Sequence, residues 1–487
     1  MAKSWLQYQP APIPIVNKSL PTNGLSVLVV FFIGLNVFYN LYRMPLEAQY
    51  LFVFADRCGI IFVANLPLLY LLAAKNQPIK FLTGYSYESL NIFHRRLGEL
   101  VCLEALLHLL GMFGVWYGLL RHLGFSLARF IFNRVVLLGL GAFVAYEVLY
   151  FTSLGSFRQR CYEIFLALHI FLQFASLALL WFHHSQSRPY VGISMGILLV
   201  DRVIFRLWLK SSSHPATLTI LDDDETMLLS ADWDTTTTSS TLLPQSMTHG
   251  WKPNDHIFLT VPTLSRKHSL QAHPFTIFSA APGPPRPSDS ESNTANHHAW
   301  FSLLIRPQSG FTRNLLVHAR LTPKIRIRVD GPYGSSHALD LLSSHSTAVI
   351  IAGGSGIAVA YPLLWALLCP RPRTSSLDIE PARPPTRKQR NVKLLWITHS
   401  LDHRSWVPGE KMRELEDWGL EVKIPPPTSV AGPGVGALLE EWVAGGMGDA
   451  GVVVSGPDGL VRDVRNVVAG LVGRGERVSV QVEKFGW

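Results

Sequence analysis

The sequence predicts a multi-domain protein, in which an all-α membrane domain of six helices precedes a soluble part with antiparallel β and then α/β structure. Three observations predict this fold class. The 487-residue chain has a positive mean hydropathy of +0.22, and only 16% of its residues are charged, whereas a soluble protein carries roughly 25%. The apolar residues are concentrated in the first 210 positions. The remainder reads as a soluble chain with short strands between turn residues.

Six apolar segments in the first part are candidate membrane spans, each of which needs about 20 mostly apolar residues. Six spans place both termini on one side of the membrane. Lys and Arg are in excess at the flanks on the side of the N-terminus, which predicts that both termini are cytoplasmic. We therefore expect a multi-pass protein surrounded by lipid, with a cytoplasmic soluble part. The six segments are Leu25–Tyr42, Cys58–Ala74, Asn91–Leu119, Ile131–Tyr150, Cys161–Phe182 and Val191–Leu209.

The formal net charge of +9 does not indicate a nucleic-acid partner. The basic residues lie largely at the ends of apolar runs, where membrane topology selects them. The four cysteines are widely spaced and form no CxxC pair, which argues against a disulfide framework and a zinc site. Residues 1–21 contain no apolar core of the required length, so no cleavable secretion signal is expected.

Four histidines in the membrane segments form two pairs with the same spacing. His94 and His108 lie in the third segment and His169 and His183 in the fifth, and each pair is fourteen positions apart. Fourteen helical residues rise about 21 Å and make close to four full turns, so both histidines of a pair face nearly the same way. The two segments cross the membrane in the same direction. Together they offer two levels with two imidazoles each, which fits two haem irons with one axial histidine from each helix.

Other polar residues of the membrane segments allow simpler interpretations. A lone intramembrane histidine is often a packing residue, but ionisable groups in a bilayer are usually functional and the repeated spacing favours ligation. His184, beside His183, matches the helical face less well. For Glu104 a structural hydrogen bond is favoured over a proton relay. Four arginines at the inner edge either meet haem propionates or only set the topology: Arg95, Arg96, Arg158 and Arg160.

The first soluble region contains a string that fits a flavin site, His273-Pro274-Phe275-Thr276-Ile277-Phe278-Ser279. Pro274 fixes the backbone, Phe275 or His273 can lie against a ring system, and Thr276 can donate a hydrogen bond to a flavin nitrogen. An ordinary strand start would read the same way. Strands are predicted nearby at Ala216–Leu221 and Ile257–Val261.

Downstream of this string, Arg306 and the turn Gly310–Arg313 precede an apolar helical run. Thr312 is predicted to be the helix N-cap, and a helix N-terminus beside an arginine is suited to a diphosphate. The strand Ile325–Val329 is expected to end in a tight turn at Gly331–Gly334. Two stretches read as loop insertions, at residues 282–298 and 370–390.

The last 140 residues alternate strand and helix, which predicts a parallel α/β sheet. The buried strand Ala348–Ala352 runs into Gly353, Gly354 and Gly356 and then an apolar helix, an arrangement that lets the backbone approach a pyrophosphate. A purely structural strand-to-helix turn would look the same. Two more strands are predicted, Val392–Ile397 and Gly451–Val454. The second ends in Ser455-Gly456-Pro457-Asp458, at the sheet edge where open α/β sheets bind ligands.

The order of these features resembles the ferric reductase and NADPH oxidase superfamily, and within it the fungal ferric/cupric metalloreductases. The resemblance covers almost the whole chain. The motifs that carry it are the two His-x13-His pairs, His94-Arg95-x-x-Gly98, Arg160-x-Tyr162-Glu163 before His169, His273-Pro274-Phe275-Thr276, Gly353-Gly354-x-Gly356-Ile357 and the terminal Phe485-x-Trp487.

The resemblance implies a domain order and a set of cofactors. An N-terminal tail (1–22) would precede a six-helix ferric reductase domain (23–210), and a ferredoxin–NADP reductase-like module would follow, with an FAD-binding β-barrel (211–337) and an NAD(P)-binding α/β domain (338–487). The inner haem b would be ligated by His94 and His169, and the outer one by His108 and His183.

The resemblance also implies the residues of the flavin and nicotinamide sites. Thr276 and Trp487 would act at the flavin, where Trp487 would stack on the ring until the nicotinamide displaces it. The remaining cofactor-binding residues would be His273, Pro274, Phe275, Ser279, Arg306 and Thr312 for FAD, and Gly353, Gly354, Gly356, Ser455, Gly456 and Pro457 for NADPH. Ser455 stands where the family has cysteine, and the Thr398-His399 strand end lacks the usual arginine. The choice between NADPH and NADH therefore stays open.

The implied activity is the reduction of extracytoplasmic ferric, and also cupric, ions or chelates by cytosolic NADPH. Two alternatives stay open, a superoxide-producing NADPH oxidase and a catalytically idle haem-binding membrane protein. The short segments around Arg121–Leu127 and His184–Pro189 and the equal histidine spacings favour the metalloreductase. The plasma membrane is the expected location, with vacuolar or other internal membranes as alternatives. The sequence names no protein partner.

Overall fold

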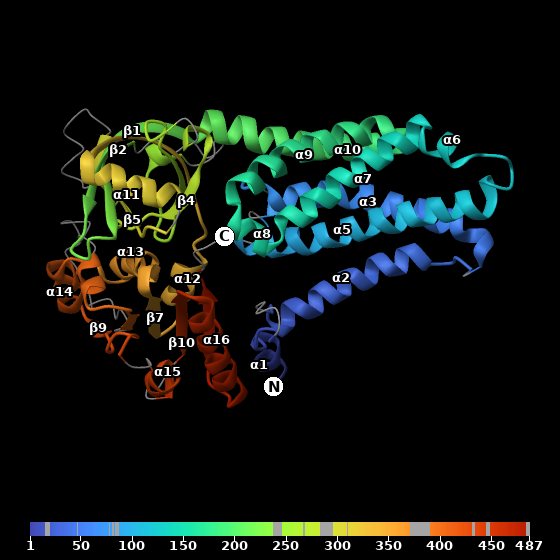
Figure 1. Cartoon of the computed structure of the whole chain (residues 1–487). Coiled ribbons are helices and arrows are strands. Elements are labelled where there is room, and N and C mark those ends of the chain that lie inside the picture. The colour runs from blue at the N-terminus through green and yellow to red at the C-terminus, as the bar shows by residue number, and fades with distance from the viewer. Residues whose placement is uncertain are drawn as a thin grey trace, which may run out of the picture. The chain divides into compact units, whose positions relative to one another are not determined.

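The computed structural model (Figure 1) describes the chain in two compact units. One unit comprises Ser26–Phe205, and the other comprises Met1–Leu25 together with Arg206–Trp487. The described residues are 1–14, 20–45, 47–76, 78–79, 82, 87–236, 246–265, 268–282, 296–308, 310–370, 390–430, 434–444 and 449–483.

Helices form at all six predicted apolar segments. In the described residues, five stretches are long and apolar enough to cross a membrane: Asn23–Leu41, Ala48–Ala73, Leu90–Leu120, Arg134–Ser153 and Tyr162–His183. The sixth segment differs from the prediction, because its α-helix has only 12 residues and continues as a π-helix that carries charged residues. The helices are α2 (Asn23–Leu41), α3 (Leu51–Ala73), α5 (Tyr87–Val115), α7 (Arg134–Ser153), α9 (Tyr162–His183), α10 (Arg188–Leu199) and η4 (Val200–Leu209).

The helices pack mainly as two pairs, α3 with α5 and α7 with α9 (Figure 1). Small residues allow close contact, as where Gly111 of α5 faces Ala55 of α3. Large apolar side chains such as Phe31 and Phe171 point outward and are 67% and 68% exposed. These helices are apolar both on the side that packs against other helices and on the exposed side, which is typical of helices surrounded by lipid. The unit is therefore an integral membrane domain.

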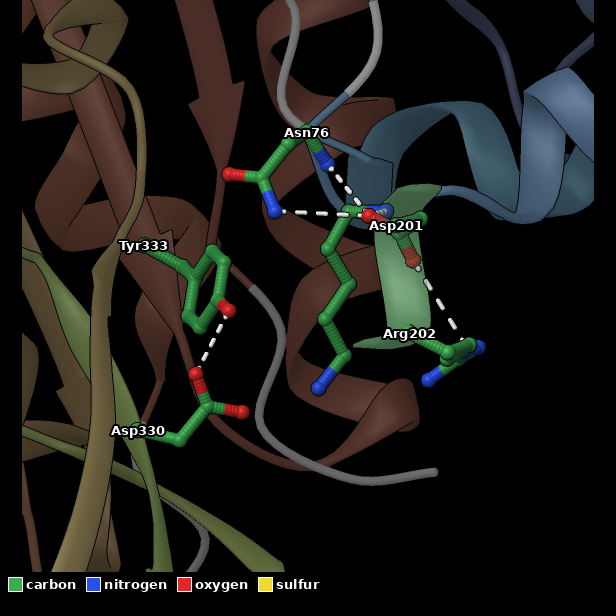
Figure 2. A network of polar contacts seen from close by, with 6 residues as sticks. Asn76, Asp201, Arg202, Asp330 and Tyr333 are labelled. Carbon is green, nitrogen blue, oxygen red and sulfur yellow. Dashed lines mark hydrogen bonds and ion pairs between the residues drawn. The ribbon is translucent and has the colours of Figure 1, made fainter. Parts of the chain in front are cut away.

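A buried carboxylate holds the end of α3 against η4. The Oδ1 atom of Asp201 accepts hydrogen bonds from the backbone N–H groups of Lys75 and Asn76, at 3.1 Å each, and from Nδ2 of Asn76 at 3.3 Å (Figure 2). Its Oδ2 atom lies 3.6 Å from Nε of Arg202. Asp201 is only 5% exposed, so these partners compensate for the loss of its hydration.

The first soluble domain is built on an antiparallel sheet with strand order β4-β3-β6-β1-β2-β5. An additional bridge between Ile277 and Leu303 connects the end of β4 to β5, so the sheet curls towards a closed barrel. β6 continues to Tyr333, so the turn predicted at Gly331–Gly334 was placed too early. The elements are β1 (Ser211–Ile220), β2 (Met227–Thr236), β3 (His256–Thr260), β4 (His273–Thr276), β5 (Asn296–Ile305), α11 (Phe311–Leu321) and β6 (Lys324–Tyr333).

The second soluble domain is the predicted parallel α/β sheet, with strand order β11-β10-β7-β8-β9. Alternate residues of β7 face opposite layers: Ile350 packs in the core with α12 and α13, and Ile351 in the core with α15 and α16. The elements are α12 (His337–Ser344), β7 (Thr347–Gly353), α13 (Ile357–Leu368), β8 (Asn391–Ile397), α14 (Gly409–Asp417), β9 (Leu420–Lys423), α15 (Val435–Ala444), β10 (Ala450–Ser455), α16 (Asp458–Gly473) and β11 (Val478–Val482).

Candidate functional site

The four predicted ligand histidines all use Nδ1 for a contact with a neighbouring helix. Three of these contacts are with backbone carbonyl oxygens, which can only accept a hydrogen bond, so Nδ1 carries the proton. The lone pair of Nε2 is then available, and this is the tautomer that a metal needs when it binds at Nε2. The contacts are His94 with Leu69 O at 3.0 Å, His108 with Ala55 O at 2.7 Å, His183 with Val135 O at 2.8 Å and His169 with Ser153 Oγ at 3.3 Å.

The outer histidines, His108 of α5 and His183 of α9, lie close together. Their ring centroids are 6.5 Å apart and the ring planes are nearly perpendicular, at 89°. A metal–imidazole bond is about 2 Å long and Nε2 lies roughly 1.1 Å from the ring centroid, so two rings on opposite sides of one metal have centroids about 6.2 Å apart. The observed separation therefore fits one axial ligand from each helix.

The inner histidines, His94 and His169, are also close enough to influence each other electrostatically. Arg202 acts on both of them. Arg95 and Arg158 likewise act on each other, whereas Arg96 is paired with Glu99 at 2.6 Å. Positive charge thus gathers beside the inner pair, where it suits acidic groups such as propionates. The sequence pattern marked Arg202 only as a flanking cation, because its electrostatic influence on both histidines depends on helix packing.

Glu104 has the structural hydrogen bonds that were favoured for it. Both carboxylate oxygens accept from Nδ2 of Asn40 on α2, at 2.8 and 3.0 Å, and Glu104 is 2% exposed. The contact satisfies a carboxyl group that would otherwise be costly in lipid. It also ties α2, whose buried residues are Asn36 and Asn40, to the rest of the helices.

The predicted flavin string forms β4 and the residues that follow it. Thr276 pairs with His256 at one end of β3, and His273 pairs with Leu259 at the other. The His273 ring stacks on Phe311 at the start of α11, with centroids 4.1 Å apart and planes inclined by 14°. This stack brings the β4 motif next to the helix end that was predicted to bind a diphosphate.

Other residues of the predicted flavin site contact the surrounding barrel. The hydroxyl of Ser279 accepts a hydrogen bond from the Ser302 backbone N–H at 3.1 Å, so it connects the motif to β5. Phe275 packs against the barrel core. Pro274 lies opposite Phe258 of β3.

The start of α11 differs in detail from the prediction. Gly310, with φ of 62°, is the N-cap, and the prediction that Thr312 is the N-cap was wrong. The Thr312 hydroxyl instead accepts from the Gln308 backbone N–H at 3.0 Å, which closes the loop before the helix. A glycine suits this position because it adopts positive φ without a steric penalty. Arg306 is exposed beside this loop.

The two predicted nicotinamide loops lie side by side at the switch point of the parallel sheet. β7 and β10 are neighbours, and the chain continues from them in opposite directions, so their carboxyl ends open the crevice where such sheets bind ligands. A Cβ on Gly353 would lie 3.3 Å from Cα of Gly456, and one on Gly356 would strike the Ser455 carbonyl group. The loops therefore pack backbone to backbone. Gly354, with φ of 55°, has open space around it, which leaves room for a ligand.

A carboxyl group that the sequence pattern did not mark lies beside these loops. The backbone N–H of Glu483 donates to Val454 O at 3.0 Å, and its side chain is hydrogen-bonded to Asn254, in the turn before β3, and to Gln481. Burial raises the pKa of Glu483. The residue thereby joins the end of the parallel sheet to the barrel domain. Trp487, the predicted stacking residue, lies outside the described residues.

His399 and Arg404 are basic residues at and after the Thr398-His399 strand end, where the family usually has an arginine for the 2′-phosphate, and both contact neighbouring loops. Nδ1 of His399 lies 3.1 Å from Oγ1 of Thr428, and the Arg404 guanidinium donates to Pro425 O at 3.2 Å. Neither contact selects NADPH over NADH.

Comparisons with known proteins match both halves of the chain. Residues 58–180 match the family of the ferric reductase like transmembrane component, and residues 240–337 match an FAD-binding domain family. The chain is 26% identical to a probable cell surface ferric reductase of Aspergillus oryzae over 85% of its length, and 25% identical to ferric reductase transmembrane component 6 of Saccharomyces cerevisiae over 95%. It spans 53% and 65% of those two relatives.

Solved structures also align with the chain, at low identity and low TM-score. A ferredoxin reductase of carbazole 1,9a-dioxygenase aligns with 56% of this chain and 69% of its own, with 13% identity and a TM-score of 0.33. A flavohemoglobin from Malassezia yamatoensis aligns with 90% of this chain and 99% of its own, with 12% identity and a TM-score of 0.38. The chain is thus similar to fungal ferric reductases, with one segment that matches a ferric reductase like transmembrane component and another that matches an FAD-binding domain.

Proposed function

We propose that the protein transfers electrons from cytosolic NADPH, by way of FAD and two b-type haems, to ferric ions or chelates on the far side of a membrane, with cupric ions as a second acceptor. The observation that carries the proposal is the set of four histidines on α5 and α9, at two levels, three of which have a partner that fixes the Nε2-accepting tautomer. The matched FAD-binding domain supports the flavin, and the names of the curated relatives support the ferric acceptor.

The haem ligands in this proposal are His94 with His169 on the inner level and His108 with His183 on the outer level. Donor chemistry and spacing both support them, because neutral imidazoles in a low-dielectric helix pair suit an iron porphyrin. When bound, the haems would act as one-electron carriers within the hydrocarbon layer. FAD would accept two electrons as a hydride and release them one at a time. Arg202 and Arg95 would hold acidic groups of the inner cofactor.

The soluble residues bind and orient the nucleotides in this proposal. Thr276 donates to the flavin edge, and His273 and Phe311 form one wall. Arg306 and the N-terminus of α11 receive the FAD diphosphate. The remaining flavin-site residues, Pro274, Phe275, Ser279 and Thr312, shape the β4 strand and its loop. The nicotinamide nucleotide would be held by the two loops that contain Gly353, Gly354, Gly356, Ser455, Gly456 and Pro457.

The proposal includes the arrangement of the chain in the cell. A tail (1–22), a membrane domain (23–210), an FAD domain (211–337) and an NAD(P) domain (338–487) follow one another, and both termini are cytoplasmic. This places the nucleotides with the cytosolic pool, and the outer histidines near the opposite surface. The plasma membrane is the proposed location, as the cell-surface name of the Aspergillus relative supports.

Anaerobic visible spectroscopy of the purified, FAD-loaded protein in detergent tests the proposal. We expect reduced b-type haem bands after addition of NADPH and their loss after addition of a ferric chelate. Bands that respond to neither NADPH nor NADH would refute transmembrane electron transfer. Reoxidation by oxygen with release of superoxide, but not by the chelate, would identify an oxidase instead.

A further inference from the structure

The outer histidines share a local arrangement on two different helices. His108 contacts the carbonyl of Ala55, and Gly59 follows that residue by four positions in α3. His183 contacts the carbonyl of Val135, and a glycine, Gly139, again follows by four positions in α7. In an α-helix the carbonyl of residue i already accepts from the N–H of residue i+4. Each of these carbonyl oxygens therefore uses its second lone pair for the imidazole.

The glycines leave the space in which the imidazole rings lie. A Cβ on Gly59 would be 2.8 Å from Nδ1 and 3.0 Å from Cε1 of His108. A Cβ on Gly139 would be 2.7 Å from Cε1 and 3.0 Å from Nδ1 of His183. Carbon atoms do not approach a ring this closely, so any larger residue would push the ring away from its carbonyl acceptor.

The inner histidines lack this arrangement. His94 contacts the carbonyl of Leu69, and the residue four positions later is Ala73, which has a Cβ. His169 contacts the hydroxyl of Ser153, at the last position of α7. The glycine positions are thus specific to the outer level.

We propose that Gly59 and Gly139 are positioning residues for the outer haem, because each lets one histidine lie close enough to a neighbouring helix to reach its carbonyl acceptor and so fixes the nearly perpendicular ring planes. This inference rests on the proposed haem ligation by His108 and His183. Sequence patterns alone do not reveal it, because glycine in a membrane helix is common.

The test compares Gly59→Ala and Gly139→Ala with Gly141→Ala, on the same helix as Gly139, where a Cβ would meet only the end of the Leu179 side chain at 3.3 Å. Alanine is the better helix former, so a defect in the first two variants would not come from a weaker helix. Haem content per chain and the low-temperature EPR spectrum of the oxidised protein are measured. Perpendicular axial imidazoles give a ferric haem a more anisotropic EPR spectrum than parallel ones.

We expect wild type and Gly141→Ala to hold two haems per chain. Gly59→Ala and Gly139→Ala should each hold one, with the anisotropic outer signal lost or shifted and the inner signal retained. The inner haem is an internal control for folding, because its ligands lie on the same two helices. Two haems with an unchanged spectrum in both variants would overturn this inference alone, as would equal loss of both haems. A wild-type protein without haem would overturn the proposed function as well.

Discussion

Under the proposed haem ligation, the contact between Ser153 and His169 predicts a selective change in the midpoint potential of the inner haem. Of the four proposed ligand histidines, His169 is the one whose Nδ1 contact is with a side chain, so a single substitution can remove the partner. Ligation of the iron through Nε2 would leave the proton of His169 on Nδ1, so that Nδ1–H would donate to Ser153 Oγ. Such a bond raises the basicity of the ligand nitrogen and stabilises the ferric state. Ser153→Ala should therefore raise the midpoint potential of the inner haem and leave that of the outer haem unchanged.

The geometry sets the size of this change. The distance of 3.3 Å between Ser153 Oγ and His169 Nδ1 is long for a hydrogen bond. The net free energy of this bond is therefore at the lower end of the usual range for hydrogen bonds, about 0.5 kcal/mol. For a one-electron couple, 1.4 kcal/mol corresponds to roughly 59 mV, so the expected shift is about 20 mV in the positive direction. The other three histidines contact backbone carbonyl groups, which no side-chain substitution removes.

Spectroelectrochemical titration of the purified protein, with two resolved midpoints, is the assay. Thr152→Val is the matched control, because the Thr152 hydroxyl bonds only within its own helix, to Val148 O at 2.7 Å and Leu149 O at 3.3 Å. A shift of the outer midpoint, a shift of both, or the same shift in the control variant would refute the role given to Ser153.

Three further substitutions test other parts of the structure. Burial raises the pKa of Glu483, so the folded state binds its proton more tightly, and stability falls as pH rises from the pKa of the unfolded state to that of the folded state. Glu483→Gln should flatten this part of a profile of melting temperature against pH. An unchanged slope would contradict the raised pKa of Glu483. Asp201→Ala removes the acceptor of three hydrogen bonds and should destabilise the membrane domain by roughly 1–3 kcal/mol, seen as a lower melting temperature in detergent; an unchanged melting temperature would count against it. Gly356→Ala forces the two predicted nicotinamide loops apart and should abolish reduction of FAD by NADPH. Gly459 has open space around it, so Gly459→Ala should leave this reduction intact. Equal rates of FAD reduction in the two variants, measured by stopped flow, would refute the role given to the close packing at Gly356.

Several features follow from the sequence because they depend on local spacing and composition. Apolar length located the helices of the membrane domain, and alternation with turn residues located strands such as β7 and β10 close to their observed bounds. Helical periodicity alone put His94 and His108 on one helix face. The predicted N-cap at Thr312 was one place where local reasoning failed, since the positive φ of Gly310 moved the helix start. The length of the sixth helix was another, because a π-helix replaces its second half.

The tertiary structure decided the features that join residues distant in the chain. The carbonyl of Ala55 lies 53 positions from His108, and that of Val135 lies 48 positions from His183, so no local pattern contains either pair. The role of Arg202 beside the inner histidines and the link from Glu483 to Asn254 depend in the same way on packing. The sequence by itself determined which side chains are candidates for the chemistry, because residue type and helical phase are local properties. Only packing decided which nitrogen carries the proton in His94, His108 and His183, since that depends on a carbonyl acceptor supplied by a different helix.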